Sequence, residues 1–236
     1  MLQPELEAGD TVVEVAELEK FHCFSEVPPD AVARLAQLAV RRRYRKGMVL
    51  CFEGEPVDAV HFIVDGRVKL WVTNEDGREQ ILALLGPGDL FPYTSFVNGD
   101  RCAGSAQALQ QTVTLAVRPD QLRRLLLEQP LLATAFLSVL AERIHHLEET
   151  VRDLSLRTVP GRLARVLINE AYRYGEKVED GYEFPFRYTQ QDLAHLVGAT
   201  RETVSRTLSA FRREGALRPG RKGRVYADIR LLAQWL

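Results

Sequence analysis

Residues 189–206 constrain the fold more than any other segment, because their pattern predicts two short helices joined by a tight turn. Thr189 and Thr200 are suitable N-cap residues for the two helices, and Asp192 completes a variant of the capping box. Gly198 stands where the first helix ends, and glycine is the residue best able to take a positive φ there. Apolar residues recur at helical spacing in both halves. The segment therefore predicts a helix-turn-helix.

The polar side of the second predicted helix carries groups that can read base pairs. Arginine can donate two hydrogen bonds to O6 and N7 of guanine, and glutamate can accept one from N4 of cytosine. The alternative is that these polar residues form only the solvated side of an amphipathic helix. The caps, the glycine and the apolar spacing all agree with a helix-turn-helix, which favours DNA binding. The predicted base-contacting residues are Arg201, Glu202, Ser205 and Arg206.

Residues 215–226 predict two short strands around a turn rich in glycine and basic residues, which is the form of a wing. The alternative for the basic residues is an ordinary exposed turn. Contacts to phosphates hold a protein on the duplex but do not choose the sequence. The predicted phosphate-contacting residues are Thr189, Gln190, Thr200, Thr203, Arg221, Lys222 and Arg224.

The formal net charge of −1 hides a division between the two parts of the chain. Residues 159–236 hold 14 Lys+Arg and 9 Asp+Glu, a net charge of +5, and residues 1–158 hold the other 17 and 23, a net charge of −6. The positive field thus coincides with the helix-turn-helix, where it favours association with DNA. With neither a signal peptide nor an apolar run of membrane-spanning length, the sequence predicts a cytoplasmic protein without a membrane partner.

The first two thirds of the chain predict a small β-structure between helical segments. Residues 30–39 form an amphipathic helical pattern, capped at Pro29-Asp30. From about residue 41 to residue 117, short alternating segments such as 60–64, 67–72 and 80–85 are separated by glycines. Many short strands with turn residues between them are typical of a small β-barrel or jelly roll.

A long helix is predicted from about residue 130 to residue 157. Its apolar residues follow spacings of 3, 4, 3, 4 and 3, which is a heptad seam typical of a parallel two-stranded contact. Packing against the chain's own β-structure is the alternative. A two-fold dimer would place two reading helices about one helical turn apart over a palindrome. Thr158-Val-Pro-Gly161 is expected to break the helix and to act as a hinge. The seam consists of Leu137, Leu140, Ile144, Leu147, Val151 and Leu154.

These parts, in this order, resemble the cyclic-AMP receptor protein / fumarate–nitrate regulator (Crp/Fnr) family over nearly the whole chain. The sharpest match is Gly198-Ala-Thr-Arg-Glu-Thr-Val-Ser-Arg206, and weaker matches lie at residues 64–69, 85–91 and 161–164. The resemblance implies an α+β fold with three parts. They are a sensory β-roll domain of the cyclic-nucleotide-binding type with an N-terminal helix (1–129), a dimerisation helix with its hinge (130–158) and a winged helix-turn-helix DNA-binding domain (159–236).

The resemblance also implies a function. It implies a sequence-specific transcriptional regulator, not an enzyme, that binds double-stranded DNA as a homodimer and also contacts RNA polymerase. Its operator would be a palindrome whose half-sites contain a TGA-like core read by Glu202 and Arg206. Arg201 matches the cyclic-AMP branch of the family, whereas Ser205 matches the fumarate–nitrate branch.

The residues of the roll argue against cyclic AMP as the effector. The cyclic-AMP branch uses Glu and Arg-Ser inside the roll, but here Pro92-Tyr93 replaces Gly-Glu, Gly104-Ser105 replaces Arg-Ser, and Arg101 is out of register. Leu147-Glu148 stands where that branch uses Thr-Ser. A cyclic phosphate needs a cation or a nest of N–H donors. The expected effector pocket is formed by Gly88, Asp89, Leu90, Phe91, Tyr93, Thr94, Ser105 and Leu147.

The effector and any cofactor stay open at this point. Cys23, Cys51 and Cys102 cannot supply the four ligands of a fumarate–nitrate-type cluster, and no setting that would lower a thiol pKa is visible for redox sensing by Cys51 or Cys102. A cyclic nucleotide, haem, another small organic molecule, or a silent sensor domain on a constitutive DNA binder are the alternatives. Candidate haem ligands are His22, His61, His145, His146 and His195.

A remote alternative is a cupin-like metalloenzyme fused to a DNA-binding tail. Such a site needs clustered histidines and a carboxylate, whereas the predicted roll offers only His61. No catalytic or metal-ligating residue is therefore predicted.

Overall fold

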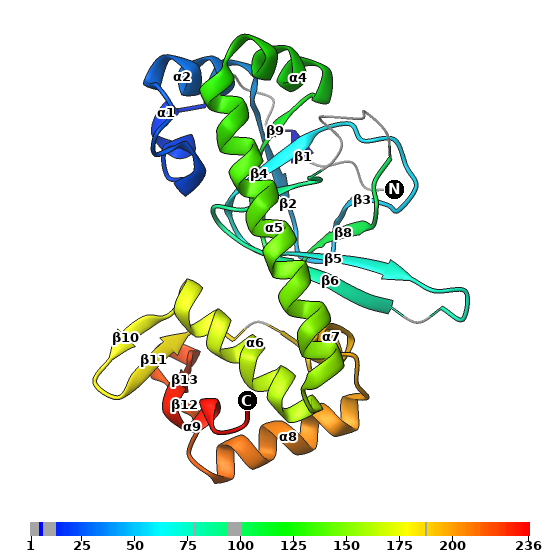
Figure 1. Cartoon of the computed structure of the whole chain (residues 1–236), viewed down its shortest axis with the longest axis vertical. Coiled ribbons are helices and arrows are strands. Elements are labelled where there is room, and N and C mark those ends of the chain that lie inside the picture. Colours follow the sequence, from blue (N-terminus) through cyan, green and yellow to red (C-terminus); the bar gives the residue numbers. More distant parts are fainter. Residues whose placement is uncertain (1–4, 7–12, 78, 94–100, 187) are drawn as a thin grey trace. The chain divides into compact units, whose positions relative to one another are not determined.

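The computed structural model describes residues 5–6, 13–77, 79–93, 101–186 and 188–236 (Figure 1). By its contacts the chain divides into two units, Met1–His145 and His146–Leu236. The boundary falls inside the long helix α5 (Pro130–Leu156), so that each unit contains one part of this helix.

Two antiparallel sheets form the roll in the first unit, as the alternating segments predict. The order of strands in the first sheet is β1 (Glu5–Leu6), β2 (Val40–Tyr44), β9 (Thr112–Val117), β4 (Val60–Asp65) and β7 (Leu90–Phe91). The order in the second sheet is β3 (Val49–Cys51), β8 (Ser105–Ala108), β5 (Val68–Thr73) and β6 (Glu79–Leu85). Six buried side chains from both sheets form one core of the roll: Ile63, Val68, Ala83, Leu85, Phe91 and Ala106.

Helices cover one face of the first sheet and form the larger core with it. They are α1 (Val15–Leu18), the 3-10 turn η1 (His22–Phe24), α2 (Pro29–Leu38), α4 (Pro119–Glu128) and the first turns of α5. Figure 1 shows α2 and α4 side by side at one end of the roll, where the two helices contact each other. An aromatic cluster of Phe21, Phe24, Phe62 and Phe136, with ring centroids 5.7–6.2 Å apart, joins the helices to β4.

Two details of the helices differ from the sequence analysis. The helix expected to be capped at Pro29-Asp30 has Pro28 as its N-cap, without a side-chain cap, and Asp30 lies inside its first turn. Pro29 stands at the first helical position, where the fixed φ of proline matches the helix. Helix α4 was not predicted.

The second unit holds a helical core beside a small sheet. Its elements are the end of α5, α6 (Val159–Tyr174), β10 (Glu176–Val178), β11 (Gly181–Phe184), α7 (Gln190–Val197), α8 (Arg201–Arg213), β12 (Leu217–Pro219), the 3-10 turn η2 (Arg221–Gly223), β13 (Val225–Ala227) and α9 (Ile229–Ala233). The sheet has the antiparallel order β10-β11-β13-β12. The β10–β11 hairpin was not predicted, although Asp180-Gly181 is a turn signal.

The predicted break over residues 158–161 is shorter in the structure. Val159, Pro160 and Gly161 already belong to α6, so only Arg157 and Thr158 separate it from α5. Thr158 is the N-cap, and its Oγ1 accepts from the Gly161 backbone N–H at 3.3 Å. Gly161 is needed for a different reason, because a Cβ there would lie 2.9 Å from the Trp235 carbonyl oxygen. The sequence showed the helix breakers but not this close approach of the C-terminal segment.

No single helix in the described part of the chain is long and apolar enough to cross a membrane. Only α4 and α5 together, which meet at a bend of 118°, pass the same length and composition test.

His61 is a buried polar residue in the core of the roll and is 1% exposed. Its ring stacks on Phe91 with centroids 5.1 Å apart, and its Nδ1 lies 3.2 Å from the Thr114 hydroxyl. Burial, assisted by the positive charge of Arg42 and opposed by Asp58, lowers the pKa of His61 to about 4. A histidine with this pKa is neutral at pH 7.

We expect acid to destabilise the roll, because the unfolded chain binds a proton at His61 that the folded chain excludes. Between pH 7 and pH 4.5 the free energy of unfolding should fall by about 2–3 kcal/mol more in the wild type than in His61→Gln. Urea unfolding followed by Trp71 fluorescence in a Trp235→Phe background measures the difference. Equal losses in the two proteins would contradict the assignment to His61.

Candidate nucleic-acid interface

Side-chain caps fix the ends of the two helices of the predicted helix-turn-helix. The Thr189 Oγ1 accepts from the Asp192 backbone N–H at 3.0 Å, and the Asp192 carboxylate accepts from the Thr189 backbone N–H at 3.0 Å. This is the predicted capping box, and it confirms Thr189 as the N-cap of α7. Gly198 ends α7 with φ 63°, and the Thr200 Oγ1 accepts from the Thr203 backbone N–H at 3.2 Å at the start of α8.

The apolar faces of α7 and α8 are buried, as the sequence pattern predicts. Val204, Leu208 and Phe211 of α8 are at most 1% exposed, and Leu193 and Ala194 of α7 are fully buried. The Phe211 ring also packs edge-on against Trp235, with centroids 5.1 Å apart. Full burial of each large apolar side chain contributes about 1.5–3 kcal/mol, so this packing holds α8 in one orientation within the unit.

The remaining side of α8 is open to solvent at its first turns. Arg201, Glu202 and Arg206 are exposed, and Ser205 is half-buried. The Arg206 guanidinium lies 3.4 Å from the Thr203 hydroxyl, one turn earlier on the same helix. The structure thus brings together on one surface the four residues predicted to contact bases.

The predicted phosphate contacts fall into two groups. Thr189, Gln190, Thr200 and Thr203 lie at the N-terminal ends of α7 and α8, where backbone N–H groups favour anions. The Thr189 hydroxyl also donates to Asp192 at 2.7 Å, so the cap uses this hydroxyl as both donor and acceptor.

The second group lies on the wing, in the turn between β12 and β13. Lys222 is exposed and has a φ of 51°. Arg221 and Arg224 are each engaged with a glutamate of the β10–β11 hairpin. Arg221 Nε lies 3.4 Å from Glu183, and Arg224 Nη1 lies 2.7 Å from Glu176. Arg221 is 78% exposed and Arg224 31%, so Arg221 and Lys222 are the better placed to reach a phosphate.

Arg162 connects the helices of this unit and was not predicted to have a role. Its Nε donates to the Val197 carbonyl at the end of α7, and its Nη1 donates to the Arg157 carbonyl after α5, both at 2.8 Å. Carbonyls at helix ends lack partners within the helix. One side chain of α6 thereby satisfies such carbonyls from two other elements.

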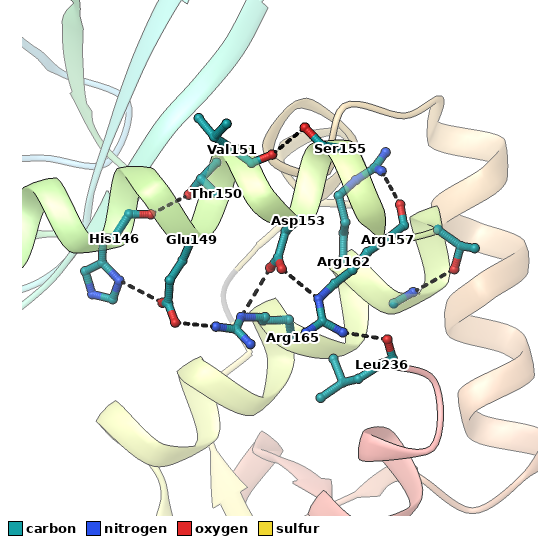
Figure 2. A network of polar contacts seen from close by, with 12 residues as sticks. His146, Glu149, Thr150, Val151, Asp153, Ser155, Arg157, Arg162, Arg165 and Leu236 are labelled. Carbon is teal, nitrogen blue, oxygen red and sulfur yellow. Dashed lines mark hydrogen bonds and ion pairs between the residues drawn. The ribbon is translucent and has the colours of Figure 1, made fainter.

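A network of ion pairs joins the end of α5 to α6 (Figure 2). The Arg165 guanidinium of α6 lies 2.5 Å from Glu149 and 3.2 Å from Asp153, which face it from successive turns of α5. Asp153 also accepts from Arg157 at 2.6 Å, and Arg157 donates to the Leu236 carbonyl at 2.5 Å. The last turns of α5 are therefore tied to both α6 and the C-terminal segment.

The predicted effector residues of the first unit lie around β7 and β8. Leu90 and Phe91 are core residues, 2% and 0% exposed. The Asp89 carboxylate accepts from the Gly86 backbone N–H at 2.8 Å, and the Ser105 Oγ accepts from the Glu53 backbone N–H at 3.0 Å. Thr94 lies outside the described residues, and Leu147 belongs to the other unit.

Comparison with known proteins decides the family. Residues 41–129 match the cyclic nucleotide-binding domain, and residues 161–235 match the Crp-like helix-turn-helix domain. A CRP-like cAMP-activated global transcriptional regulator of Mycobacterium tuberculosis is 32% identical over 211 residues, covering 89% of this chain and 94% of the relative. The cyclic AMP receptor protein of Thermus thermophilus is 31% identical, covering 84% and 88%.

A solved structure agrees. FixK2 of Bradyrhizobium japonicum superimposes with a TM-score of 0.75 at 26% identity, covering 84% of this chain and 96% of that protein. The chain belongs to the Crp/Fnr family of transcriptional regulators. The α+β fold with a cyclic-nucleotide-binding type of roll and a C-terminal winged helix-turn-helix is confirmed.

Two of the arginines in or beside the roll of this Crp/Fnr protein, Arg101 and Arg143, contact protein carbonyls. Arg101 Nη1 donates to the Gly54 carbonyl at 2.6 Å. Arg143, on the part of α5 that belongs to the first unit, donates to the Leu82 carbonyl at 3.1 Å and lies 5.3 Å from the centre of the Tyr93 ring. Arg143 was missed by the sequence analysis, because only the fold brings it beside Tyr93.

The described histidines are spread over the protein. His61 lies in the core of the roll, His146 Nδ1 lies 3.7 Å from Glu149, and His195 contacts Gln191 on α7. Within the described ranges, no three His, Cys, Asp or Glu side chains are grouped as metal ligands would be.

We expect Arg165→Met to loosen the attachment of α6 to the end of α5. The three charged side chains of these ion pairs are only 14–26% exposed, so their loss should cost about 1–2 kcal/mol. Native-state hydrogen exchange of the α6 amides measures this as a lower free energy of opening. The exposed Arg152→Met is the matched control and should change it by less than about 0.5 kcal/mol. Equal effects of the two substitutions would show that the network does not stabilise α6.

Proposed function

We propose that this Crp/Fnr regulator acts as a homodimer on a palindromic operator and that α8 of each subunit enters the major groove. In this proposal residues 1–129 form the sensory domain, residues 130–158 the dimerisation helix with its hinge, and residues 159–236 the DNA-binding domain. The observation that carries the proposal is the surface of α8. It presents two arginines and a glutamate to solvent, while its opposite face is buried in the unit.

The chemistry of this surface supports sequence reading. Arg201 and Arg206 can each pair with a guanine, and Glu202 can accept from a cytosine. The net charge of +5 on residues 159–236 favours the approach of a polyanion. A half-site with a TGA-like core is proposed from the family resemblance.

The exposed seam of α5 supports the homodimer. Leu137, Ile144 and Val151 are 58–64% exposed, and Leu147 and Leu154 are 45–47% exposed. Leu140 differs, because it packs in part against the larger core of the roll. Five large apolar side chains on one helical seam are a surface that a second α5 can cover.

We further propose that the effector is not cyclic AMP, although relatives are named as cAMP-activated or as cyclic AMP receptor proteins. Pro92-Tyr93 stands in place of Gly-Glu, and Arg101 is engaged with the Gly54 carbonyl. Tyr93 lies against Arg143, so the aromatic ring and not a ligand anion faces this cation. The effector is a small molecule or a redox signal. A small molecule would shift the population between two dimer states because it binds one state more tightly than the other. A redox signal would shift it by changing one state chemically.

The ion pairs of Arg165 are the proposed connection between the dimer helix and the reading helix. They hold the last turns of α5 against α6, while Arg162 holds α6 against the end of α7. A change in α5 would then turn α7 and α8 as a group.

We propose that the protein is not an enzyme, that it works in the cytoplasm, where the DNA lies, and that it contacts RNA polymerase on the operator.

The proposal predicts that Arg206→Ala loses about 1–3 kcal/mol of discrimination at one G·C pair of each half-site, because it removes a bidentate contact. Binding-site selection with wild type and variant measures the change in the motif. Arg213→Ala, exposed at the other end of α8, is the control and should leave the motif unchanged. An identical motif from Arg206→Ala would refute the role of Arg206.

The proposed dimer predicts that Val151→Glu produces monomers, because it places two like charges against each other in an apolar seam. Sedimentation velocity should show the monomer, and the affinity for a palindromic operator should fall by at least about 100-fold, as each half-site is then bound singly. Arg152→Glu, one residue away and exposed, should remain dimeric. A wild-type monomer, or a dimeric Val151→Glu, would contradict the assigned seam.

A further inference from the structure

Two cysteines that are far apart in the sequence lie in neighbouring segments of the roll. Cys51 ends β3 and pairs with Ala106 of β8. Cys102 lies just before β8, where its N–H donates to the Glu55 carbonyl at 2.9 Å and its carbonyl accepts from the Gly54 N–H at 2.8 Å. Residues 51–56 and 101–106 therefore run side by side, with Pro56 bridged to Arg101 at the far end.

The two thiols lie close enough within this pair of segments to shift each other's pKa. The Cys51 thiol donates to the Gly104 carbonyl oxygen at 3.9 Å, two residues beyond Cys102. Cys102 is 3% exposed and Cys51 is half-buried, so the pair is shielded from large thiol reagents.

The surroundings give the two sulfurs different roles. The hydrogen bond from Cys51 lowers the pKa of Cys102, against the opposing effects of burial and of the negative charges of Asp58 and Glu55. The same hydrogen bond, together with burial, raises the pKa of Cys51. Cys102 is thus the more readily ionised of the two sulfurs, and a thiolate is the form of cysteine that attacks oxidants.

We propose that Cys51 and Cys102 form a peroxide-sensitive dithiol that closes reversibly to an intramolecular disulfide. Its effect on DNA binding rests on the function proposed above, whereas the formation of the bond does not. Peroxide would then be the redox signal, and Cys51 and Cys102 would be the sensing residues.

The reaction has two steps. The Cys102 thiolate attacks one oxygen of hydrogen peroxide, the O–O bond breaks, and a sulfenic acid and hydroxide form. The Cys51 thiol then loses its proton and attacks the Cys102 sulfur, so that an S–S bond forms and water leaves with the sulfenic oxygen. Two thiols are oxidised and one peroxide is reduced, and a dithiol reductant reverses the change.

The position of the bond explains how it would act on the sensor. It would clamp the turn after β3 to the segment that leads into β8. Ser105, one of the expected effector residues, lies at the start of β8, and its Oγ accepts from the Glu53 N–H between the same two segments.

Cys23 serves as an internal control, because we expect it not to react with peroxide. It lies in η1, beside the larger core, and burial raises its pKa to about 12. A thiol with this pKa is almost entirely protonated at neutral pH and reacts slowly with peroxide.

The test uses the full-length protein, reduced and freed of reductant. It is exposed while folded to a small excess of hydrogen peroxide, then denatured and alkylated with N-ethylmaleimide, and digested without reduction. We expect one cross-linked peptide pair that joins Cys51 to Cys102, with a mass two hydrogen atoms below the sum of the two reduced peptides. Cys23 should be recovered in its alkylated form. Dithiothreitol should separate the pair. In Cys51→Ser the sulfenic acid on Cys102 should persist and be trapped by dimedone.

Two results would overturn the dithiol. In one, Cys51 and Cys102 are still alkylated after peroxide treatment while the protein remains folded. In the other, a Cys23→Ser protein forms only disulfides between subunits.

Operator binding tests the regulatory part. The affinity of oxidised and reduced protein should differ by at least about fivefold, and Cys51→Ser should abolish the difference. Equal affinities of the cross-linked and reduced protein would refute regulation but not the dithiol. A reduced protein that selects no DNA motif would refute the proposed function, while the cross-linking result would stand.

Discussion

The burial of one face of α8 is the interaction on which the proposed DNA-reading surface depends. Val204, Leu208 and Phe211 are anchored in the core of the second unit, and this leaves Arg201, Glu202 and Arg206 on the open side. The caps at Thr189 and Thr200 and the left-handed Gly198 determine where each helix starts or stops. A reading helix needs this rigidity, because base-edge hydrogen bonds tolerate little error in position.

Polar contacts extend this rigidity to the neighbouring helices. Arg162 and Arg165 are three residues apart on α6, and they reach different elements: Arg162 holds the end of α7, and Arg165 holds the last turns of α5. Partly buried ion pairs contribute little to net stability but are costly to break on one side. They therefore fix the arrangement of the helices more than they raise its stability, as the proposed connection from α5 to α8 requires.

The roll shares the architecture of the family but differs in the chemistry of its interior. Its interior holds a neutral histidine packed between aromatic rings and a tyrosine beside an arginine. The proposed dithiol at the edge of the second sheet would sense a signal without a bound ligand. Family membership establishes the scaffold of the roll, whereas the proposed signal rests on the side chains of this chain.

Local patterns in the sequence determined the helix-turn-helix, its caps, the wing, the short strands of the roll and the long helix, because each depends on residues within a few positions of one another. The four residues expected to read bases share one face for the same reason. Tertiary structure alone decided the contacts between distant segments. Arg165 meets Glu149 and Asp153, Gly161 admits the Trp235 carbonyl, and Cys51 meets Cys102 across 50 intervening residues. Spacing along a chain carries no record of such pairs, since they form only when the sheets and helices fold upon one another.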